Sequence, residues 1–76
     1  MYLYLIARTD DVGHDEVRSV VVAAPTAALA RQAARDIKEG DQSPEVWAPA
    51  TATLNRLGTA DRKVRAGVIH MDMHHG

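Results

Sequence analysis

One segment of this chain constrains the fold more than any other. Residues 20–24 have the sequence VVVAA, without a polar side chain among them. β-Branched side chains favour extended backbone, and a strand that is apolar on both sides is typical of the interior of a sheet. Residues 17–24 are therefore predicted to form a central strand that needs cover on both of its faces.

The N-terminal segment is predicted to pair with that strand. Residues 2–7, with the sequence YLYLIA, are rich in aromatic and branched side chains that alternate between two sides. Residues 9–16 follow, and their acidic side chains and Gly13 favour a turn. Together these patterns predict a β-hairpin.

A single helix is predicted after the hairpin. Thr26 can cap a helix N-terminus, and residues 27–39 are rich in good helix formers. Gly40 is placed to end this helix in the left-handed conformation. An apolar stripe is expected to face the sheet, and it consists of Leu29, Ala30, Ala33, Ala34 and Ile37. Leu29 and Ile37 are expected to anchor the helix, because alanines bury little area.

The segment after the helix is predicted to be irregular at first. Residues 41–49 contain two prolines, and Trp47, the only tryptophan, is interpreted as a buried structural side chain rather than a ligand platform. Residues 51–57 are compatible with a helix or a strand. Two threonines and the Gly58 that follows them favour a strand.

The chain is predicted to end in another strand. Residues 61–65 form a charged turn, residues 66–73 alternate as a strand does, and residues 74–76 are expected to be a flexible tail. The result is one small α+β domain over residues 1–73 with the order ββαββ. Its two hairpins are joined by one helix, most simply as a four-stranded, largely antiparallel sheet with the helix packed on one face.

The uncovered face of this sheet is where a function is expected. One helix covers one face, whereas the first two strands are apolar on both sides, and large exposed apolar patches mark association or ligand sites. The side chains expected to face the helix are Leu3, Leu5, Ile69, Met71 and Met73. The uncovered face would then carry Tyr2, Tyr4, Ile6, Val68, His70 and Asp72. The interaction face predicted from this pattern is Tyr2, Tyr4, Ile6 and His70.

Composition narrows the function classes. The chain has 76 residues, no cysteine and a net charge of −1. This length excludes two domains, and the lack of cysteine excludes a disulfide framework, a thiolate zinc site and a cysteine nucleophile; a reducing compartment is the natural environment. The near-neutral charge gives no bulk attraction to nucleic acid or anionic lipid. Residues 1–6 are too short an apolar run for a membrane anchor and carry no basic residue, so neither an anchor nor a signal peptide is expected.

A series of short features runs through most of the chain. They are Val20-Val21-Val22-Ala23-Ala24, Ala30-Arg31 in the predicted helix, Trp47, Leu57-Gly58-Thr59-Ala60 and Gly67-Val68-Ile69-His70-Met71-Asp72. In this order they resemble the features of small proteins encoded by tailed phages of actinobacteria. The resemblance implies a phage-encoded protein that acts in the cytoplasm of a bacterial host, through a host or phage partner, and it includes no catalytic signature.

A metal site is one specific hypothesis. His70, Asp72 and His74 recur at every second position, so they lie on one side of a strand, and imidazole with carboxylate suits zinc or nickel. Neighbouring ligands on one strand are about 7 Å apart, so the three converge only if the tail bends. A solvent-exposed strand end is the simpler interpretation, and no cofactor is expected.

The predicted hairpin loop holds a second polar cluster. Its members are Asp10, Asp11, His14, Asp15 and Glu16. Such residues can bind a divalent cation or act as acid and base. The cluster lacks the spacing of a calcium-binding loop, because Val12 stands where an oxygen ligand is needed. A solvated turn is the simpler interpretation.

Two sets of residues support an alternative function. Tyr2 and Tyr4 on an open sheet face can stack on bases, while Arg62, Lys63 and Arg65 can bind phosphate. A nucleic-acid-binding domain normally has a stronger basic footprint, so nucleic acid is not the favoured partner. Binding of a small anionic ligand such as a nucleotide, or of nucleic acid, is the alternative to binding a protein.

The sequence shows no catalytic set. No nucleophile with an adjacent base and no glycine-rich phosphate loop occurs in it. The chain is therefore predicted to be a non-enzymatic interaction module that forms a homo-oligomer or binds a host or phage protein, without a membrane partner.

Overall fold

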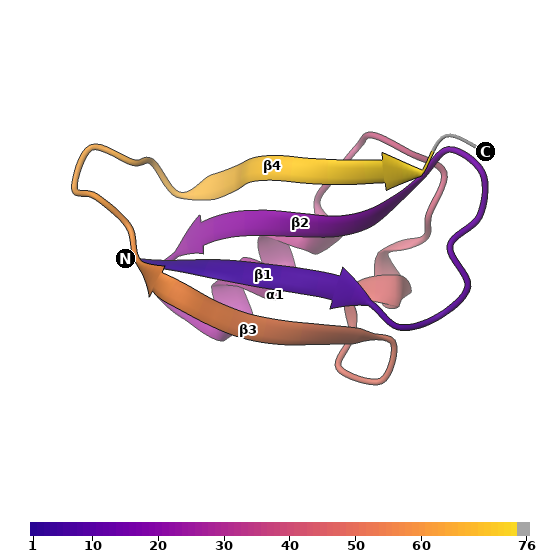
Figure 1. The fold of residues 1–76 in the computed structure, drawn as a ribbon, viewed down its shortest axis with the longest axis horizontal. Helices are drawn as coiled ribbons and strands as arrows, with labels where there is room; N and C mark the ends of the chain where they lie inside the picture. The colour runs from indigo at the N-terminus through magenta and orange to yellow at the C-terminus, as the bar shows by residue number, and fades with distance from the viewer. Residues whose placement is uncertain (75–76) are drawn as a thin grey trace.

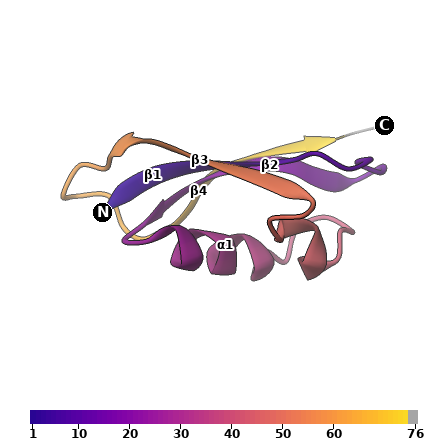
Figure 2. The same cartoon turned by 90° about the horizontal axis from the view of Figure 1, so that it is seen from below.

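A computed structural model describes residues 1–74, which form one four-stranded sheet and one helix (Figure 1). The elements are β1 (Tyr2–Arg8), β2 (Glu16–Ala24), α1 (Ala27–Arg35), the short 3-10 helix η1 (Pro44–Trp47), β3 (Ala52–Thr59) and β4 (Gly67–His74). This confirms the predicted ββαββ order and the strand at residues 51–57. Figure 2 shows the helix on one side of the sheet. No helix within residues 1–74 is long and apolar enough to cross a membrane.

The sheet places its most apolar strands at the centre. The strand order is β3-β1-β2-β4, and every neighbouring pair is antiparallel. β1 and β2 are apolar on both sides and therefore gain most from having neighbours on both edges. β3 and β4 carry residues such as Asn55, Arg56, His70 and Asp72, which tolerate the solvent at a sheet edge.

The predicted second hairpin is wrong, because β3 and β4 lie on opposite edges of the sheet (Figure 1). Residues 60–66 connect them past the ends of the central strands, and the Ala60 amide donates a hydrogen bond to the Met1 carbonyl at 3.0 Å. The two edge strands are three strand spacings apart, about 14 Å. A connection of this length spans up to about 23 Å, so it reaches across as readily as it turns back.

The helix begins as predicted and ends early. The Thr26 hydroxyl accepts a hydrogen bond from the Leu29 amide at 3.2 Å, which confirms the N-cap. The last helical residue is Arg35, four residues before the predicted end at 39. There the Ile37 amide donates to the Ala34 carbonyl at 3.2 Å, a tighter bond that closes the final turn.

Gly40 has the left-handed conformation that was predicted, but it does not cap the helix. Its φ is 82°, and it lies in the loop beyond the helix end. The neighbouring Asp41 amide donates to the Asp15 carbonyl at 3.0 Å, and the Gln42 side chain accepts from the Val17 amide at 2.8 Å. The chain leaves the helix early because this loop bonds to the start of β2.

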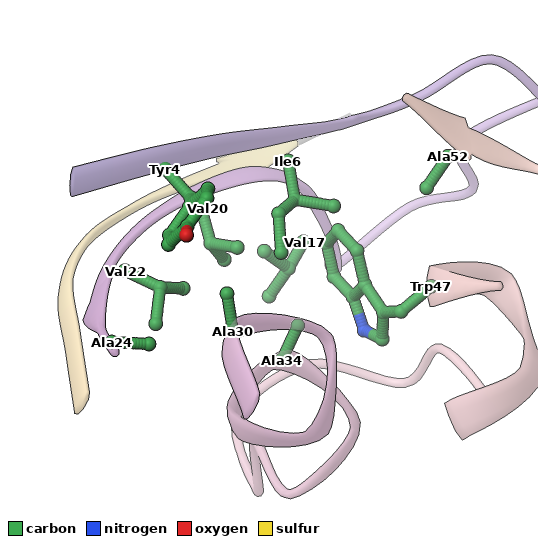
Figure 3. Close-up of a cluster of buried hydrophobic side chains, with 10 residues drawn as sticks. All are labelled: Tyr4, Ile6, Val17, Val20, Val22, Ala24, Ala30, Ala34, Trp47 and Ala52. Carbon is green, nitrogen blue, oxygen red and sulfur yellow. The ribbon is translucent and has the colours of Figure 1, made fainter. Parts of the chain in front are cut away.

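The core lies between α1 and the sheet (Figure 3). Ala30 and Ala34 of the helix are fully buried, and Trp47 of η1 is 1% exposed, as expected for a structural side chain. Alanines bring the helix backbone close to the strands, so the bulk of the core comes from the other elements. The buried residues that the sheet contributes to this core are Tyr4, Ile6, Val17, Val20, Val22, Ala24 and Ala52.

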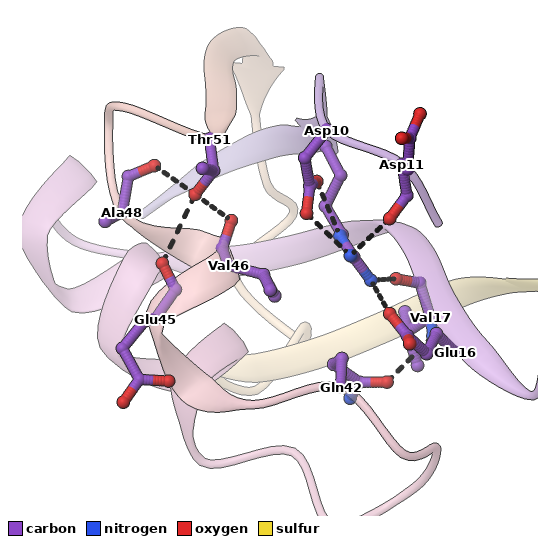
Figure 4. Close-up of polar contacts among 10 residues, drawn as sticks. Asp10, Asp11, Glu16, Val17, Gln42, Glu45, Val46, Ala48 and Thr51 are labelled. Carbon is purple, nitrogen blue, oxygen red and sulfur yellow. Dashed lines mark hydrogen bonds and ion pairs between the residues drawn. The ribbon is translucent and has the colours of Figure 1, made fainter. Parts of the chain in front are cut away.

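Polar bonds hold η1 in place at the end of this core. Arg31 of the helix donates from Nη1 to the carbonyls of Trp47 and Ala52, at 2.9 and 3.1 Å. The Thr51 hydroxyl donates to the Val46 carbonyl at 2.8 Å (Figure 4). These bonds satisfy carbonyl groups of η1 and of the first residue of β3, so the irregular segment is fixed and the indole stays in the core.

Candidate interaction face

The strand register defines which side chains face away from the helix. Tyr4 and Ile6 belong to the core, so alternation places Leu3 and Leu5 on the other side of β1. Paired residues of neighbouring strands share a face, which extends the assignment to the whole sheet. This open face consists of Leu3, Leu5, Ala7, Ser19, Val21, Ala23, Thr53, Asn55, Gly58, Gly67, His70 and Asp72.

The centre of the open face is an apolar stripe over the two central strands. The central stripe consists of Leu3, Leu5, Ala7, Val21 and Ala23. Leu5 pairs with Val21 and Leu3 with Ala23. Leu3, Leu5 and Val21 are half-buried by their neighbours, and Ala23 is fully covered. An antiparallel sheet with one face in water normally alternates apolar and polar residues, so five apolar positions here depart from that pattern.

Polar side chains frame the central stripe on both edge strands. Asn55 and Thr53 of β3 pair with Leu5 and Ala7, while His70 and Asp72 of β4 pair with Val21 and Ser19. The polar frame, which is Thr53, Asn55, His70 and Asp72, is exposed. An apolar centre with a polar rim is the composition of a protein interface.

The predicted placement of the tyrosines and Ile6 on the uncovered face is wrong. Tyr4 is 5% exposed and Ile6 is fully buried beneath the helix. Tyr2 packs partly against the same core and lies under the Arg56 guanidinium, 4.7 Å from the ring centre. The alanine-rich helix leaves space that bulky side chains must fill, and β1 offers its larger residues on this side. Of the predicted interaction face, His70 alone lies on the open face.

The same reversal applies to the other predicted residues. Leu3 and Leu5 face away from the helix rather than toward it, and Val68 packs against the core rather than on the open face. The prediction that Met71 and Met73 point toward the helix is confirmed. Ile69 is 51% exposed at a β-bulge opposite β2.

The histidines of β4 do not form a metal centre. His70, Asp72 and His74 lie along one side of the strand, but no three potential ligands within residues 1–74 are grouped to hold an ion. His74 is the last residue of β4 rather than part of a tail, because it pairs with Glu16. Its Nδ1 accepts a hydrogen bond from Arg18 Nη2 at 2.6 Å. The remaining predicted tail, residues 75–76, lies outside the described residues.

The acidic hairpin loop is organised around Arg8, a residue that the sequence reasoning missed. Figure 4 labels the partners of this arginine, among them Asp10, Asp11 and Glu16. The Arg8 side chain is 2% exposed and donates to both carboxylate oxygens of Asp10, at 2.9 and 2.8 Å. It also donates to Glu16 Oε1 at 2.7 Å and to the Val17 carbonyl at 3.1 Å. The available signal was a strand-end arginine directly before an acidic loop.

These bonds change the chemistry of the loop. The hydrogen bonds from Arg8 are the main cause that lowers the pKa of Asp10 below its usual value, and the same pair raises the pKa of Arg8. A carboxylate held in its ionised form by an arginine is a poor general base or acid near neutral pH. The loop is therefore a structural brace between β1 and β2.

The three basic residues predicted to bind an anion lie in the connection between β3 and β4. Arg62, Lys63 and Arg65 are all exposed. The carboxylate of Asp61 accepts a hydrogen bond from the Lys63 amide at 2.9 Å, so an acidic group lies within this basic segment. The cluster is a solvated turn, away from the open face.

A shallow apolar groove lies beside the helix. It has a volume of about 400 Å³ and is lined by residues of β2, α1 and the start of β4, among them Ala23, Leu29, Ala33 and Gly67. Leu29 is 52% exposed there, so the prediction that it anchors the helix is wrong. Ala30, one position further on, takes the buried site because the helix approaches the sheet closely.

Comparisons with known proteins do not assign this chain to a family. No protein-family model, no curated protein and no solved structure matches it. A function for this chain is therefore inferred from the open face and its polar frame.

Proposed function

We propose that this protein acts by protein association through the open face, and that a second copy of the same chain is the partner. The observation that carries this proposal is the central stripe. β1 and β2 are apolar on both sides, and α1 covers one side of them (Figure 2). Burial of the second side removes half-exposed Leu3, Leu5 and Val21 from water.

The size of the molecule limits how large a dimer interface can be. The molecule measures 36 × 22 × 18 Å along its principal axes, and the sheet lies across the two longer ones (Figure 1). The outline of the broad side, loops included, is at most about 800 Å² from these extents, so the whole open face has to be buried to approach the roughly 800 Å² that each partner buries in a standard interface. A chain of 76 residues also has a small core, which a second copy would extend.

The alternative function has less support. Base stacking needed both tyrosines on the uncovered face, whereas Tyr4 is buried and Tyr2 is covered by Arg56. A non-enzymatic role and an origin in a phage of actinobacteria remain part of the proposal, with a host protein as a competing partner.

Sedimentation of the purified chain tests the proposal. We expect a dimer at micromolar concentrations, and we expect Leu5→Glu to give a folded monomer because a carboxylate cannot be buried in the central stripe. Ala28→Glu, which puts the same charge on an exposed position of α1, is the matched control and should remain dimeric. A well-folded wild-type monomer at high micromolar concentration would overturn the proposal.

A further inference from the structure

We infer that the two copies pack with their two-fold axis parallel to the strands, so that β1 of one protomer lies over β2 of its partner. This arrangement rests on the proposed dimer and adds which strands meet. Stacked sheets pack about 10 Å apart, with strands either aligned within about 30° or nearly perpendicular. In aligned packing, the two-fold axis runs either along the strands or across them, and the two choices bring different residues together.

An axis along the strands matches larger side chains with smaller ones. It exchanges the two central strands and leaves each residue at the same level along them. Leu5 then lies over the partner's Val21, because these two residues are paired within each sheet. Leu3 likewise lies over the position of the partner's Ala23, a small residue that is already fully covered within its own chain and adds no apolar contact itself. Such alternation lets two flat sheets interdigitate without voids.

The same axis also brings polar residues of one frame close to polar residues of the partner's frame. It exchanges the two edge strands, so Asn55 of β3 lies near the partner's His70 and Thr53 lies near the partner's Asp72. An amide with an imidazole, and a hydroxyl with a carboxylate, are donor and acceptor pairs. Within one chain the Thr53 hydroxyl donates to the Ala7 carbonyl at 3.3 Å, so it has to turn from this long bond to the partner's carboxylate. Each pair occurs twice in the dimer, so the exposed polar groups of the rim gain partners when water leaves.

An axis across the strands at the level of Leu5 gives a poorer match. It places Leu5 over the partner's Leu5 and His70 over the partner's His70. Asp72 then lies over the partner's Gly67, which has no side chain to donate a hydrogen bond. The first arrangement is favoured because it leaves no carboxylate without a donor.

Cross-linking of single-cysteine variants distinguishes the arrangements, because the natural chain has no cysteine to interfere. Asn55→Cys and His70→Cys change exposed edge-strand residues outside the core, so both variants should fold. The variants are mixed in equal amounts, allowed to exchange subunits, and treated with a short bis-maleimide. Lys38→Cys, at an exposed position beyond the helix, replaces either variant as the control.

We expect the mixture to give a covalent heterodimer, with a yield limited to the half of the dimers that contain both variants. Each variant alone, and each mixture with Lys38→Cys, should give little product. Efficient linking of His70→Cys to itself would overturn the inferred axis. Absence of linking in a mixture that sediments as a dimer would also overturn the axis and leave the proposed function intact, whereas a monomer in sedimentation would overturn both.

Discussion

On the two central strands, the two faces of the sheet differ in the size of their side chains more than in their polarity. The covered face presents Tyr4 and Ile6 to a helix that offers alanines. The open face presents Leu5 and Val21 at its centre, beside the small Ala7 and Ser19. The bulky side chains face the alanine-rich helix. The smaller side chains face the side on which the proposed second sheet would pack.

The two faces also differ in whether their charged and polar side chains are paired within the chain. Arg8 ends the covered side of β1, and its donors are all directed to groups of the same chain, so the side chain is buried without an unpaired charge. His70 and Asp72 stay exposed at the rim of the open face. The charged group of the covered face is therefore fully paired within one chain, whereas the charged and polar groups of the open face are exposed, and a proposed partner would meet them there.

Loss of Trp47 should have the largest effect. Trp47→Ala removes the largest fully buried side chain of the covered face and should lower the free energy of unfolding by about 3–5 kcal/mol. A domain of this size has only a few kcal/mol of stability, so the variant should be largely unfolded. Circular dichroism with urea titration measures this. Leu29→Ala, at an exposed apolar position, is the control and should change stability by less than about 1 kcal/mol.

A matched pair of substitutions compares the faces directly. Ile6→Ala should lower the free energy of unfolding by about 2–5 kcal/mol at every protein concentration, because it leaves a cavity under the helix. Leu5→Ala changes the preceding residue of the same strand. It should lower the free energy of unfolding of the monomer by less than Ile6→Ala does, and it should weaken the dimer. Urea titrations at two protein concentrations separate the effects. Equal, concentration-independent losses would show that the two faces do not differ in role.

The smallest effect concerns pH. Arg8 lowers the pKa of Asp10 below its usual value of 3.8, so the pair stabilises the fold fully above that value. This stability is lost as the pH falls through the lower pKa of the folded state. Asp10→Asn should lower the free energy of unfolding by less than about 1 kcal/mol at pH 7, with no difference from wild type in strong acid.

The matched control for this pH effect is Asp11→Asn. Asp11 contacts Arg8 through its backbone carbonyl and not its side chain, so the substitution should leave the pH profile unchanged. A profile for Asp10→Asn that parallels wild type down to the acid limit would show that the brace does not contribute to stability.

Local patterns in the sequence were sufficient for the elements. The valine-rich segment, the Thr26 cap and the buried Trp47 each depend on interactions within a few residues or on simple burial, and the structure confirms them. The early end of α1 was not predictable in the same way, because it depends on the loop bond between Gln42 and Val17, 25 positions apart.

Local patterns along the chain account for four strands, one helix and an excess of apolar surface on the central strands. Which face the helix covers was decided by the tertiary structure, because Tyr4 and Leu5 are both apolar and alternation does not rank them. The alanine-rich helix leaves space that the larger set of β1 side chains fills. This requirement determines which face of the sheet the helix covers. The positions of β3 and β4 on opposite edges were decided in the same way, since a connection of this length permits either arrangement and only pairing of the whole sheet selects one.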